Sequence, residues 1–413
     1  MFRNYLLTAY KVFMRRKLFT AINLACIVLT LVVLMVITAL LENAFYPTGV
    51  EGKSERMLQV MTMETHAKDD AQIRSSPIGY KVIDKYLRPL KSVELVSALT
   101  MAQTVSAYQG ERVSELMMRR TDANYWKILD FKLLAGRLPT ADDDAQGRFV
   151  AVINAATARK LFGDAPAVGN KIDVGSQHFE VIGVVGDEFH LNAYADIWVP
   201  ITTFPNSQYK SQMWGEFSAL LLAKNKADLP QIRAEVQAIA KTVEIEGPDM
   251  WEKAYFWADS KLDLFARQLL SHNTQPDSGA TQFVASIVVM MLLFMMMPAL
   301  NLVNLNMGRI MERSSEIGVR KAFGATSAQL VGQLVMENIL LCMVGGVIGL
   351  LCAEGVLLWL EGSGLIPYLN VSLNLAVFGY GLLITVVFGL LSGVIPAWKM
   401  SRLDPVHALK GVA

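Results

Sequence analysis

Two short segments of this 413-residue chain resemble nucleotide-binding motifs at first sight. Residues 49–54 contain two glycines followed by lysine and serine, as a phosphate-binding loop does. That loop needs four residues between its glycines so that backbone amides surround the phosphates, and here only two separate them. Residues 391–393 lie inside a long apolar run, out of reach of nucleotide. We therefore expect no ATP hydrolysis by this chain.

Candidate metal ligands are equally sparse. The acidic run 142–144 lacks the glycine and the terminal glutamate of a calcium loop, so we expect a solvated loop there. Histidines of the polar region show no paired ligand spacing, and we interpret them as surface or core residues: His66, His178, His190 and His272. No nucleophile–base pair stands out in the sequence. The prediction is a non-catalytic chain that binds no cofactor or metal of its own.

The most informative segment covers residues 309–321 and reads R-I-M-E-R-S-S-E-I-G-V-R-K. It lies between two long apolar runs, so both of its ends are tethered to a membrane. Its acidic and basic side chains offer charge to a soluble partner, while Ile317 and Gly318 allow close approach. A solvated charged loop is the alternative. With no ligand chemistry of its own, the segment suits being pushed by another protein.

Apolar runs on either side must position this segment. The chain is 53% hydrophobic and 18% charged, whereas an average soluble protein is about 45–50% apolar and about 25% charged. About 20 apolar residues cross a bilayer as a helix. We predict four transmembrane α-helices, at residues 21–41, 283–307, 337–360 and 373–397. The first is longer than the apolar part of a signal peptide, so we expect it to be retained.

Lysine and arginine in short loops predict the orientation of the helices. Residues 1–20, the loop 308–336 and the tail 398–413 are basic, and the loop 361–372 has no basic residue. Both termini and the loop 308–336 are therefore expected in the cytoplasm, and residues 42–282 outside. Apolar residues of the first twenty follow a helical stripe, which indicates an amphipathic helix on the inner leaflet. An ordinary cytoplasmic start to the first span is the alternative.

Residues 42–282 have the pattern of a mixed α/β domain, of one or two subdomains, inserted between the first two spans. Residues 149–153 and 179–185 are predicted strands, and residues 155–162 and 230–243 are predicted helices. The three cysteines lie in the apolar runs, so no disulfide framework supports this domain. Its size allows a core held by packing alone.

Within the loop 308–336, the sequence predicts one helix over 309–323 that ends at Gly324. Thr326 and Gln329 then have the spacing of a capping box. From Ser327 we expect an unbroken helix to Leu360, about 50 Å long at about 1.5 Å per residue. Such a rod would join the cytoplasmic contact to the outer face of the membrane.

Several residues of the spans have their own interpretation. Glu337 lies where the rod enters the membrane, where an acid is either functional or a snorkelling or capping residue. Small residues four apart let helices approach closely, as at Gly345 with Gly349 and at Gly389 with Gly393. Pro396 is expected to interrupt the last span. Asp404 and Pro405 form the start of a short helix, 405–410.

These residues resemble the MacB/FtsX-like family of ABC transporter permeases, and the resemblance spans essentially the whole chain. In the loop it is carried by Glu312, Arg313, Glu316, Ile317, Gly318, Val319, Arg320, Lys321, Ala322, Gly324 and Ala325, followed by Glu337, Gly345, Gly346 and Gly349. At the tail it is carried by Pro396, Ala397, Arg402, Asp404, Pro405, Val406, Ala408 and Leu409. Residues 161–163, 168–169, 181–185 and 199–200 are similar to the family's periplasmic core. His407 departs from the pattern, since an acid is usual there.

The resemblance implies a bacterial inner-membrane permease that works as a dimer of two identical or paralogous chains. Each chain would bind a separate cytoplasmic ABC ATPase through Glu312, Arg313, Glu316, Ile317, Gly318, Arg320, Lys321, Gly324, Ala325, Asp404 and Pro405. ATP would bind that partner and not this chain. Its ATP-driven closure would move the periplasmic domains for efflux, without passing substrate through the membrane core.

The resemblance also bears on further partners and on the alternatives. Several family members work with a periplasmic adaptor and an outer-membrane channel. MacB itself carries its ATPase on the same chain, so this chain resembles only its membrane part. The alternatives are an FtsX-like signalling subunit that regulates an envelope enzyme and a lipoprotein-release permease. Contact with nucleic acid is not expected, and membrane lipid surrounds the spans.

Overall fold

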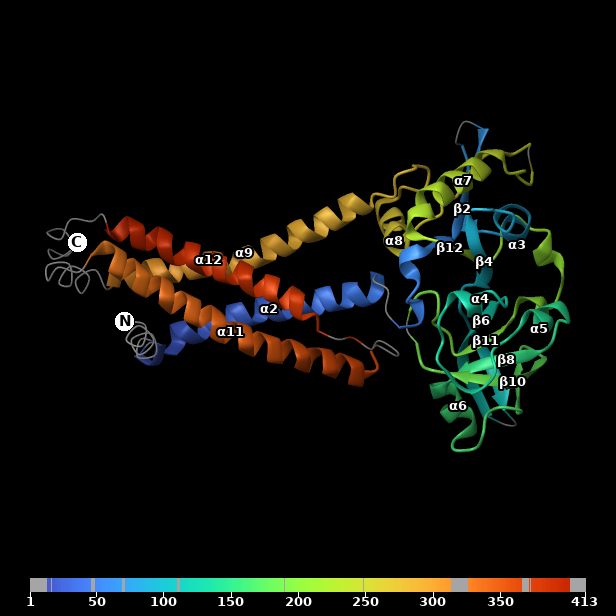
Figure 1. The fold of residues 1–413 in the computed structure, drawn as a ribbon, viewed down its shortest axis with the longest axis horizontal. Coiled ribbons are helices and arrows are strands. Elements are labelled where there is room, and N and C mark those ends of the chain that lie inside the picture. The colour runs from blue at the N-terminus through green and yellow to red at the C-terminus, as the bar shows by residue number, and fades with distance from the viewer. Residues whose placement is uncertain are drawn as a thin grey trace. The chain divides into compact units, whose positions relative to one another are not determined.

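A computed structural model describes residues 13–15, 17–45, 49–68, 71–109, 112–188, 190–247, 249–312, 326–365, 371 and 373–401. The chain forms two compact units, Asn43–Phe283 (the outer unit) and Met1–Glu42 with Val284–Ala413 (the helical unit). Helices α2 (Lys17–Phe45) and α9 (Ala280–Glu312) each contribute residues to both units (Figure 1).

The outer unit is built on a ten-stranded mixed sheet and a separate three-stranded sheet. The large sheet has the order β1 (Met57–Val60), β12 (Phe217–Ala223), β4 (Val93–Thr100), β6 (Arg112–Thr121), β11 (Ile197–Pro200), β8 (Val150–Asn154), β10 (Gln177–Val185), β9 (Lys171–Val174) and β5 (Gln103–Gln109), with β7 (Leu133–Gly136) paired to β10. The small sheet has the order β13 (Trp251–Tyr255), β2 (Thr62–Ala67) and β3 (Ile73–Pro77).

Part of the large sheet closes on itself. β5 pairs with β9 at one edge and with β6 at the other, so β6, β11, β8, β10, β9 and β5 form a ring. Closure satisfies the strand edges that an open sheet would expose. Alternate residues of these strands fill the interior, among them Ile153, Ile172, Phe179 and Ile197. The ring is therefore a packed barrel.

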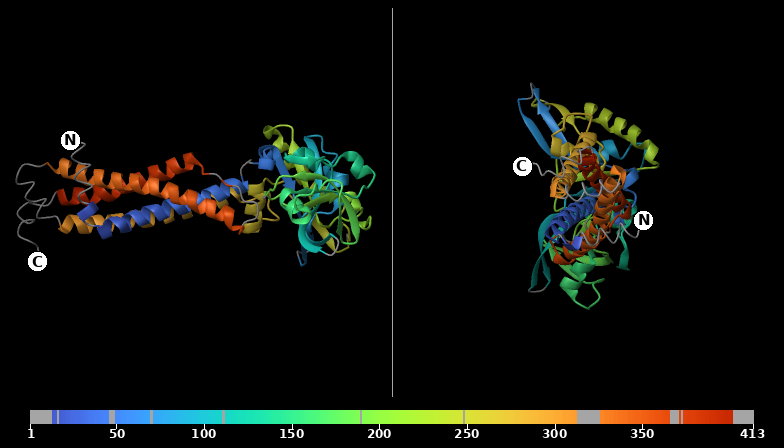
Figure 2. Two further views of the ribbon diagram at one scale, coloured as in Figure 1. Left: turned by 90° about the horizontal axis from the view of Figure 1, so that it is seen from below. Right: turned by 90° about the vertical axis from the view of Figure 1, so that its left-hand side faces the viewer.

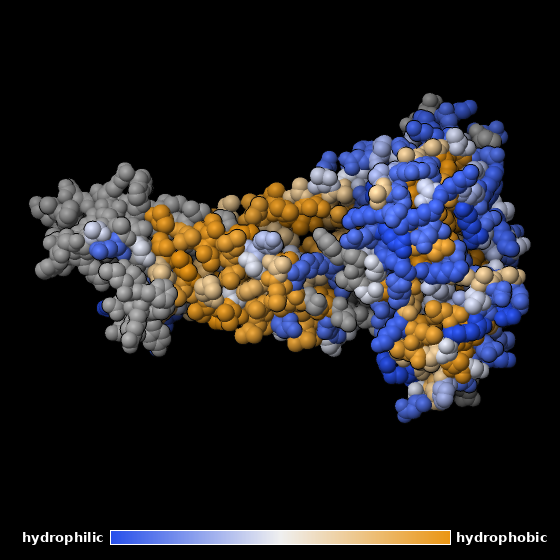
Figure 3. Space-filling view, viewed as in Figure 1, coloured by the Kyte–Doolittle hydropathy of each residue, from blue (hydrophilic) through white to orange (hydrophobic). Residues whose placement is uncertain are grey.

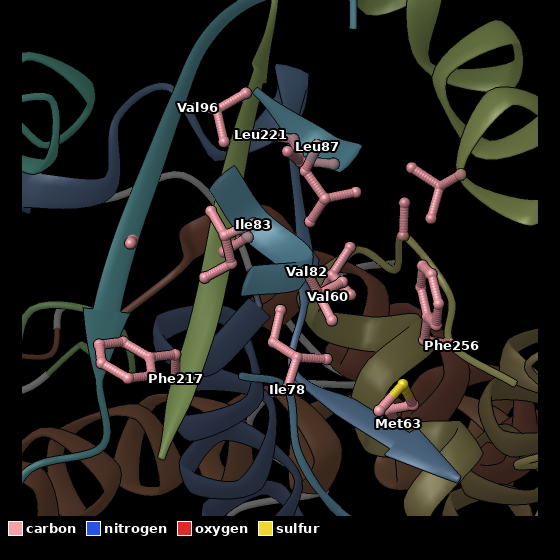
Figure 4. Packing of buried hydrophobic residues seen from close by; sticks show 14 of the residues in the cluster. Val60, Met63, Ile78, Val82, Ile83, Leu87, Val96, Phe217, Leu221 and Phe256 are labelled. Atoms are coloured by element: carbon pink, nitrogen blue, oxygen red, sulfur yellow. The ribbon is translucent and has the colours of Figure 1, made fainter. Parts of the chain in front are cut away.

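A second core lies where the open part of the sheet meets helices (Figure 4). The helical turn α3 (Tyr80–Val82), its π-helical continuation η4 (Ile83–Leu87) and helix α7 (Leu229–Thr242) cover strands β1, β4 and β12. Ile232 and Val236 of α7 point into this core, and Ile239 packs against it. The predicted helix 230–243 and its apolar side are thereby confirmed.

The other helices of the outer unit are short. They are α4 (Tyr125–Ile128), α5 (Ala141–Ala145), α6 (Ala155–Phe162), α8 (Lys261–Leu270) and the 3-10 turns η1 (Gly49–Glu51), η2 (Ser54–Arg56), η5 (Ile201–Thr203), η6 (Gln208–Lys210) and η7 (Lys226–Asp228). Helix α6 has the predicted bounds, and its start is fixed by the Asn154 side chain, which accepts from Thr157 N at 2.7 Å. Strands β8 and β10 fall on the segments predicted as strands.

The acidic run 142–144 is not the solvated loop that the sequence predicted. It forms helix α5, whose first turn is held by a capping box between Thr140 and Asp143. Asp143 is fully buried and accepts hydrogen bonds from Arg137 and Arg148. The Arg137 guanidinium holds the pKa of that carboxyl well below its usual range. The acids therefore cap and anchor a helix.

The helical unit contains parts of α2 and α9 together with α11 (Ser327–Ser363) and α12 (Leu375–Ser401). Among the described residues, Thr20–Phe45 and Val335–Ser363 are long and apolar enough to cross a membrane, and Ala280–Met296 and Leu375–Val387 are shorter apolar stretches. On the face shown in Figure 3, the described surface of this unit is largely apolar. Helices α11 (orange) and α12 (red) run side by side (Figure 2).

Helix α9 continues past the predicted span to Glu312, within the charged segment. One prediction in this unit was wrong: helix α12 is not interrupted at Pro396 but continues through it to Ser401. Proline removes a single backbone donor, and apolar helices tolerate it where local adjustments or neighbouring groups satisfy the freed carbonyl.

Asp144 predicts a measurable pH dependence in the outer unit. Its Oδ2 accepts from Ala123 N at 2.7 Å, and Oδ1 is buried without a partner among the described residues. Burial, with Asp122 nearby, raises the pKa of Asp144 to about 6. Because the folded-state pKa lies above the ordinary value, this carboxyl favours the folded unit at pH 4, and that contribution is lost as pH rises through about 6.

We therefore expect Asp144→Asn to stabilise the protein at pH 7.5 by about 1 kcal/mol, a figure reduced for the partial exposure of the group. The gain should vanish at about pH 4. Denaturant unfolding at both pH values measures it, with the exposed neighbour Asp142→Asn as the matched control. An equal gain at both pH values would show that Asp144 does not titrate in this way.

Candidate functional site

Most residues predicted to contact a soluble partner lie outside the described residues. These are Arg313, Glu316, Ile317, Gly318, Arg320, Lys321, Gly324, Ala325, Asp404 and Pro405. Glu312 is the last residue of α9. The structure therefore describes the two helices that flank the charged segment, and the roles of these residues stay predictions.

The helix that follows the charged segment has a fixed start. Thr326 is its N-cap, in extended conformation, and its side chain accepts from Gln329 N at 3.4 Å. In return, Thr326 N donates to the Gln329 Oε1 at 3.1 Å. These reciprocal bonds satisfy two of the amide groups left open at a helix start. The capping box predicted from the sequence is confirmed.

From this cap, α11 runs without a break for 37 residues, or about 55 Å at about 1.5 Å per residue. It ends at Gly364, which adopts the left-handed conformation at φ 67°. The predicted unbroken rod is confirmed, with its end three residues later than expected. Residues 327–363 therefore form one continuous hydrogen-bonded element.

Helix α11 approaches α2 very closely at two glycines. A Cβ atom at Gly345 would lie 2.6 Å from the Cγ2 atom of Ile27, and one at Gly349 would lie 3.1 Å from the Cβ atom of Leu31. A larger residue at the first position would require the Ile27 side chain or its helix to shift. Gly389 and Gly393 lie in α12, at positions where the structure describes the backbone only.

The third helix of this core, α12, packs on both of the others. A Cβ atom at Gly346 of α11 would lie 2.6 Å from Leu382, and one at Gly381 would lie 2.9 Å from Leu34 of α2. At the start of α12, the Asn374 side chain accepts from Ala376 N at 2.9 Å and donates to Glu42 Oε1 at 2.7 Å. Helices α2, α11 and α12 therefore form one packed group.

The helical unit also buries three polar residues, and the register between α2 and α11 shows where one of them lies. Gly345 faces Ile27 and Gly349 faces Leu31, so the two helices keep one register over a full turn. Four residues earlier, the same register brings Asn23 level with Leu341. Asn23, Glu337 and Asn338 are all buried within the helical unit. The snorkelling interpretation of Glu337 requires an exposed side chain and does not fit this burial. Glu354, by contrast, is exposed.

In the outer unit, residues that resemble parts of ligand sites in the sequence are bonded to other side chains or to the backbone of the protein. Lys53, the lysine of the loop-like segment 49–54, donates to Asp130 Oδ1 at 2.6 Å and to Lys127 O at 3.0 Å. His66 contacts Glu64 at 2.7 Å, and His178 contacts Asp173 at 2.5 Å. Among the described residues, no group of three or more His, Cys, Asp or Glu side chains is placed to hold a metal ion.

One buried polar cluster of the outer unit was not predicted from the sequence. The Tyr125 hydroxyl donates to Asn192 O at 2.7 Å and accepts from Trp198 Nε1 at 3.2 Å. Burial raises the pKa of Tyr125 to about 12. The Arg119 guanidinium donates to the carbonyls of Leu191 and Tyr194, and its burial lowers the pKa of this arginine. These groups come from separate elements, so no sequence motif identifies them.

Comparison with known proteins finds a matching family model for each of the two units. The family model described as "MacB-like periplasmic core domain" matches residues 20–239. The model described as "FtsX-like permease C-terminal" matches residues 288–405. Apolar helices joined to an α/β unit of this kind define a membrane permease with an extracellular domain. The chain belongs to the MacB/FtsX-like family of ABC transporter permeases.

Individual relatives are distant. The uncharacterized ABC transporter permease YknZ of Bacillus subtilis is 24% identical over 328 residues, 79% of this chain and 77% of that protein. The macrolide export ATP-binding/permease protein MacB of Chromobacterium violaceum is 27% identical over 289 residues, 69% of this chain and 42% of that protein. This chain thus matches less than half the length of that MacB.

Among solved structures, the extracellular domain of YknZ from Gram-positive bacteria is 17% identical and has a TM-score of 0.38. The match covers 48% of this chain and 98% of the YknZ domain.

The close approach of α2 and α11 predicts a position-specific effect of a larger side chain. Gly345→Leu should force the two helices apart and destabilise the protein by about 1–3 kcal/mol. Gly355→Leu is the matched control, because no atom lies within 4 Å of a Cβ at that position of the same helix. Thermal unfolding of the purified full chain in detergent measures both. Equal stability of the two variants would contradict the packing described here.

Proposed function

We propose that this chain is the membrane subunit of an ABC transporter that transmits movement from a separate cytoplasmic ATPase to the outer unit. The ATPase binds residues 308–336 and the tail 398–413, and ATP is bound by that partner alone. The movement of the outer unit drives export of a substrate on the periplasmic side. The chain itself does no covalent chemistry and binds no cofactor.

One observation carries this proposal: α2 and α9 are continuous helices that contribute residues to both compact units. A helix resists bending over such lengths, because each turn is held by backbone hydrogen bonds. Helix α11 is packed against α2 through Gly345 and starts at a fixed cap beside the charged segment. A push on the charged segment can therefore reach α2, and through α2 the outer unit.

The proposed topology has four spans, formed by α2, α9, α11 and α12, with both termini in the cytoplasm of a bacterial inner membrane. The basic residues of 1–20, 308–336 and 398–413 support this orientation. We further propose a dimer with a second copy or a paralogue, as membership of the permease family suggests. A periplasmic adaptor and an outer-membrane channel are additional proposed partners.

Two other functions are compatible with the same family. An FtsX-like subunit would use the same movement to regulate an envelope enzyme, and a lipoprotein-release permease would use it to extract a lipidated protein. The partner of the outer unit distinguishes these functions. Affinity purification of the full chain should recover an adaptor with a channel if it exports, a wall hydrolase if it regulates, and lipoproteins if it releases them.

The charged segment supplies the direct test of ATPase coupling. Glu316→Ala together with Arg320→Ala removes charge from the proposed contact and should weaken association with the co-purifying ATPase by about tenfold or more. The matched control removes an exposed ion pair of the outer unit, Glu55→Ala with Lys226→Ala, whose atoms are 3.4 Å apart. Binding is measured on the full chain in detergent. Unchanged affinity and ATPase activity in the first variant would reject this contact.

A further inference from the structure

The ends of the two helices shared by both units meet on one short helix of the outer unit, α8. The Phe265 ring of α8 contacts the ring of Phe45, the last residue of α2, with centroids 5.6 Å apart. The same ring contacts Phe283, in the first turns of α9, also at 5.6 Å. One side chain therefore touches both helices at the point where each joins the outer unit.

The start of α8 holds the end of α2. Lys261 is buried, and its ammonium group donates to Ala44 O at 3.5 Å, in the last turn of α2. A cation is favourable there because the carbonyl end of a helix carries partial negative charge. The same ammonium contacts the fully buried Glu51 carboxylate. Burial lowers the pKa of Lys261 to about 8.

The end of α8 holds the connection to α9. Arg267 binds Asp259 through two hydrogen bonds, at 2.7 and 3.2 Å. It also donates to the carbonyl oxygens of His272 and Gln275, at 2.5 and 2.6 Å. The Ser278 hydroxyl donates to Asp263 of α8 at 2.6 Å. The connection between α8 and α9 is thereby fixed at several points, so α8 and the start of α9 must move together.

From Glu51, a chain of buried contacts leads into the barrel. Glu51 Oε1 accepts from Asn192 N at 3.1 Å, and Asn192 O accepts from the Tyr125 hydroxyl at 2.7 Å. Tyr125 in turn accepts from Trp198 of β11, a strand of the barrel. Each contact is buried, so water does not compete for its partners. A displacement of Lys261 therefore acts on Asn192, and through it on the barrel.

We propose that α8 is the element that receives the movement of α2 and α9, and that Lys261 and Glu51 are the positioning residues that pass it to residues 190–196. This inference rests on the proposed function. A pair that served only to hold the fold could be replaced by uncharged side chains of similar shape without loss, because desolvation offsets most of the attraction in a buried pair. The positioning role requires the charges themselves.

The test measures hydrogen exchange in the full chain bound to its co-purifying ATPase, without nucleotide and with ATP and vanadate. In the natural protein, exchange of the amides of residues 190–196 should differ between the two states by about fivefold or more. Glu51→Gln combined with Lys261→Met keeps the shape of the pair and an acceptor for Asn192 N, and should reduce that difference to below about a third. Lys261→Arg retains the charge and should retain the difference.

The matched control is Glu55→Gln with Lys226→Met, an exposed pair of the same region, which should leave the nucleotide-dependent difference unchanged. Thermal unfolding of each variant separates lost coupling from lost folding. A double variant at Glu51 and Lys261 with the full nucleotide-dependent difference overturns the inference. So does a natural protein that hydrolyses ATP in the complex with no change at residues 190–196, and the proposed function then stands. Failure of any ATPase to bind overturns both.

Discussion

A methyl group at position 345 would lie 2.6 Å from Ile27, so α11 and α2 approach as closely as they do because glycine occupies that position. The rest of the helical unit depends on this contact. It fixes the register of the two helices, and Asn23, Glu337 and Asn338 are buried in the same unit. Helix α12 then closes the group through Gly346 and Gly381. Close packing of this kind supports movement of a rigid group.

The outer unit is stabilised by sheet closure and by core packing. Its closed barrel satisfies strand edges, while a second core joins the open strands to α3, η4 and α7. Within the outer unit, the residues next to both chain crossings pack on α8: Phe45 and Phe283 contact the Phe265 ring, and the buried ion pair of Lys261 with Glu51 lies at the start of the same helix. In the proposed mechanism, α8 is the element that would receive the movement.

Local signals in the sequence predicted much of this arrangement. The Thr326 capping box, the unbroken helix from Ser327, the bounds of α6 and the buried side of α7 follow from short-range patterns, and all four are confirmed. The capping box of α5 was equally local, yet it was missed because three adjacent acids suggested a solvated loop. Pro396 was misjudged because a proline in an apolar helix costs less than one in water.

Other features could not be predicted from one sequence. The barrel depends on pairing β5 with β9, strands separated by more than 60 positions. Lys261 and Glu51 are 210 positions apart, and nothing near either residue marks it as half of a buried pair. Except for Glu312, the residues predicted to contact an ATPase lie outside the described residues, and their role stays a prediction.

The central claim is that movement supplied at residues 309–325 acts on the outer unit from the opposite side of a membrane. Labelling single cysteines with a membrane-impermeant reagent in sealed, intact spheroplasts tests it most directly, with Cys26, Cys342 and Cys352 replaced by alanine. Lys226→Cys, at an exposed position of the outer unit, should react at once, and Arg313→Cys should react only after the membrane is permeabilised. Reaction of both cysteines in intact cells would contradict the account.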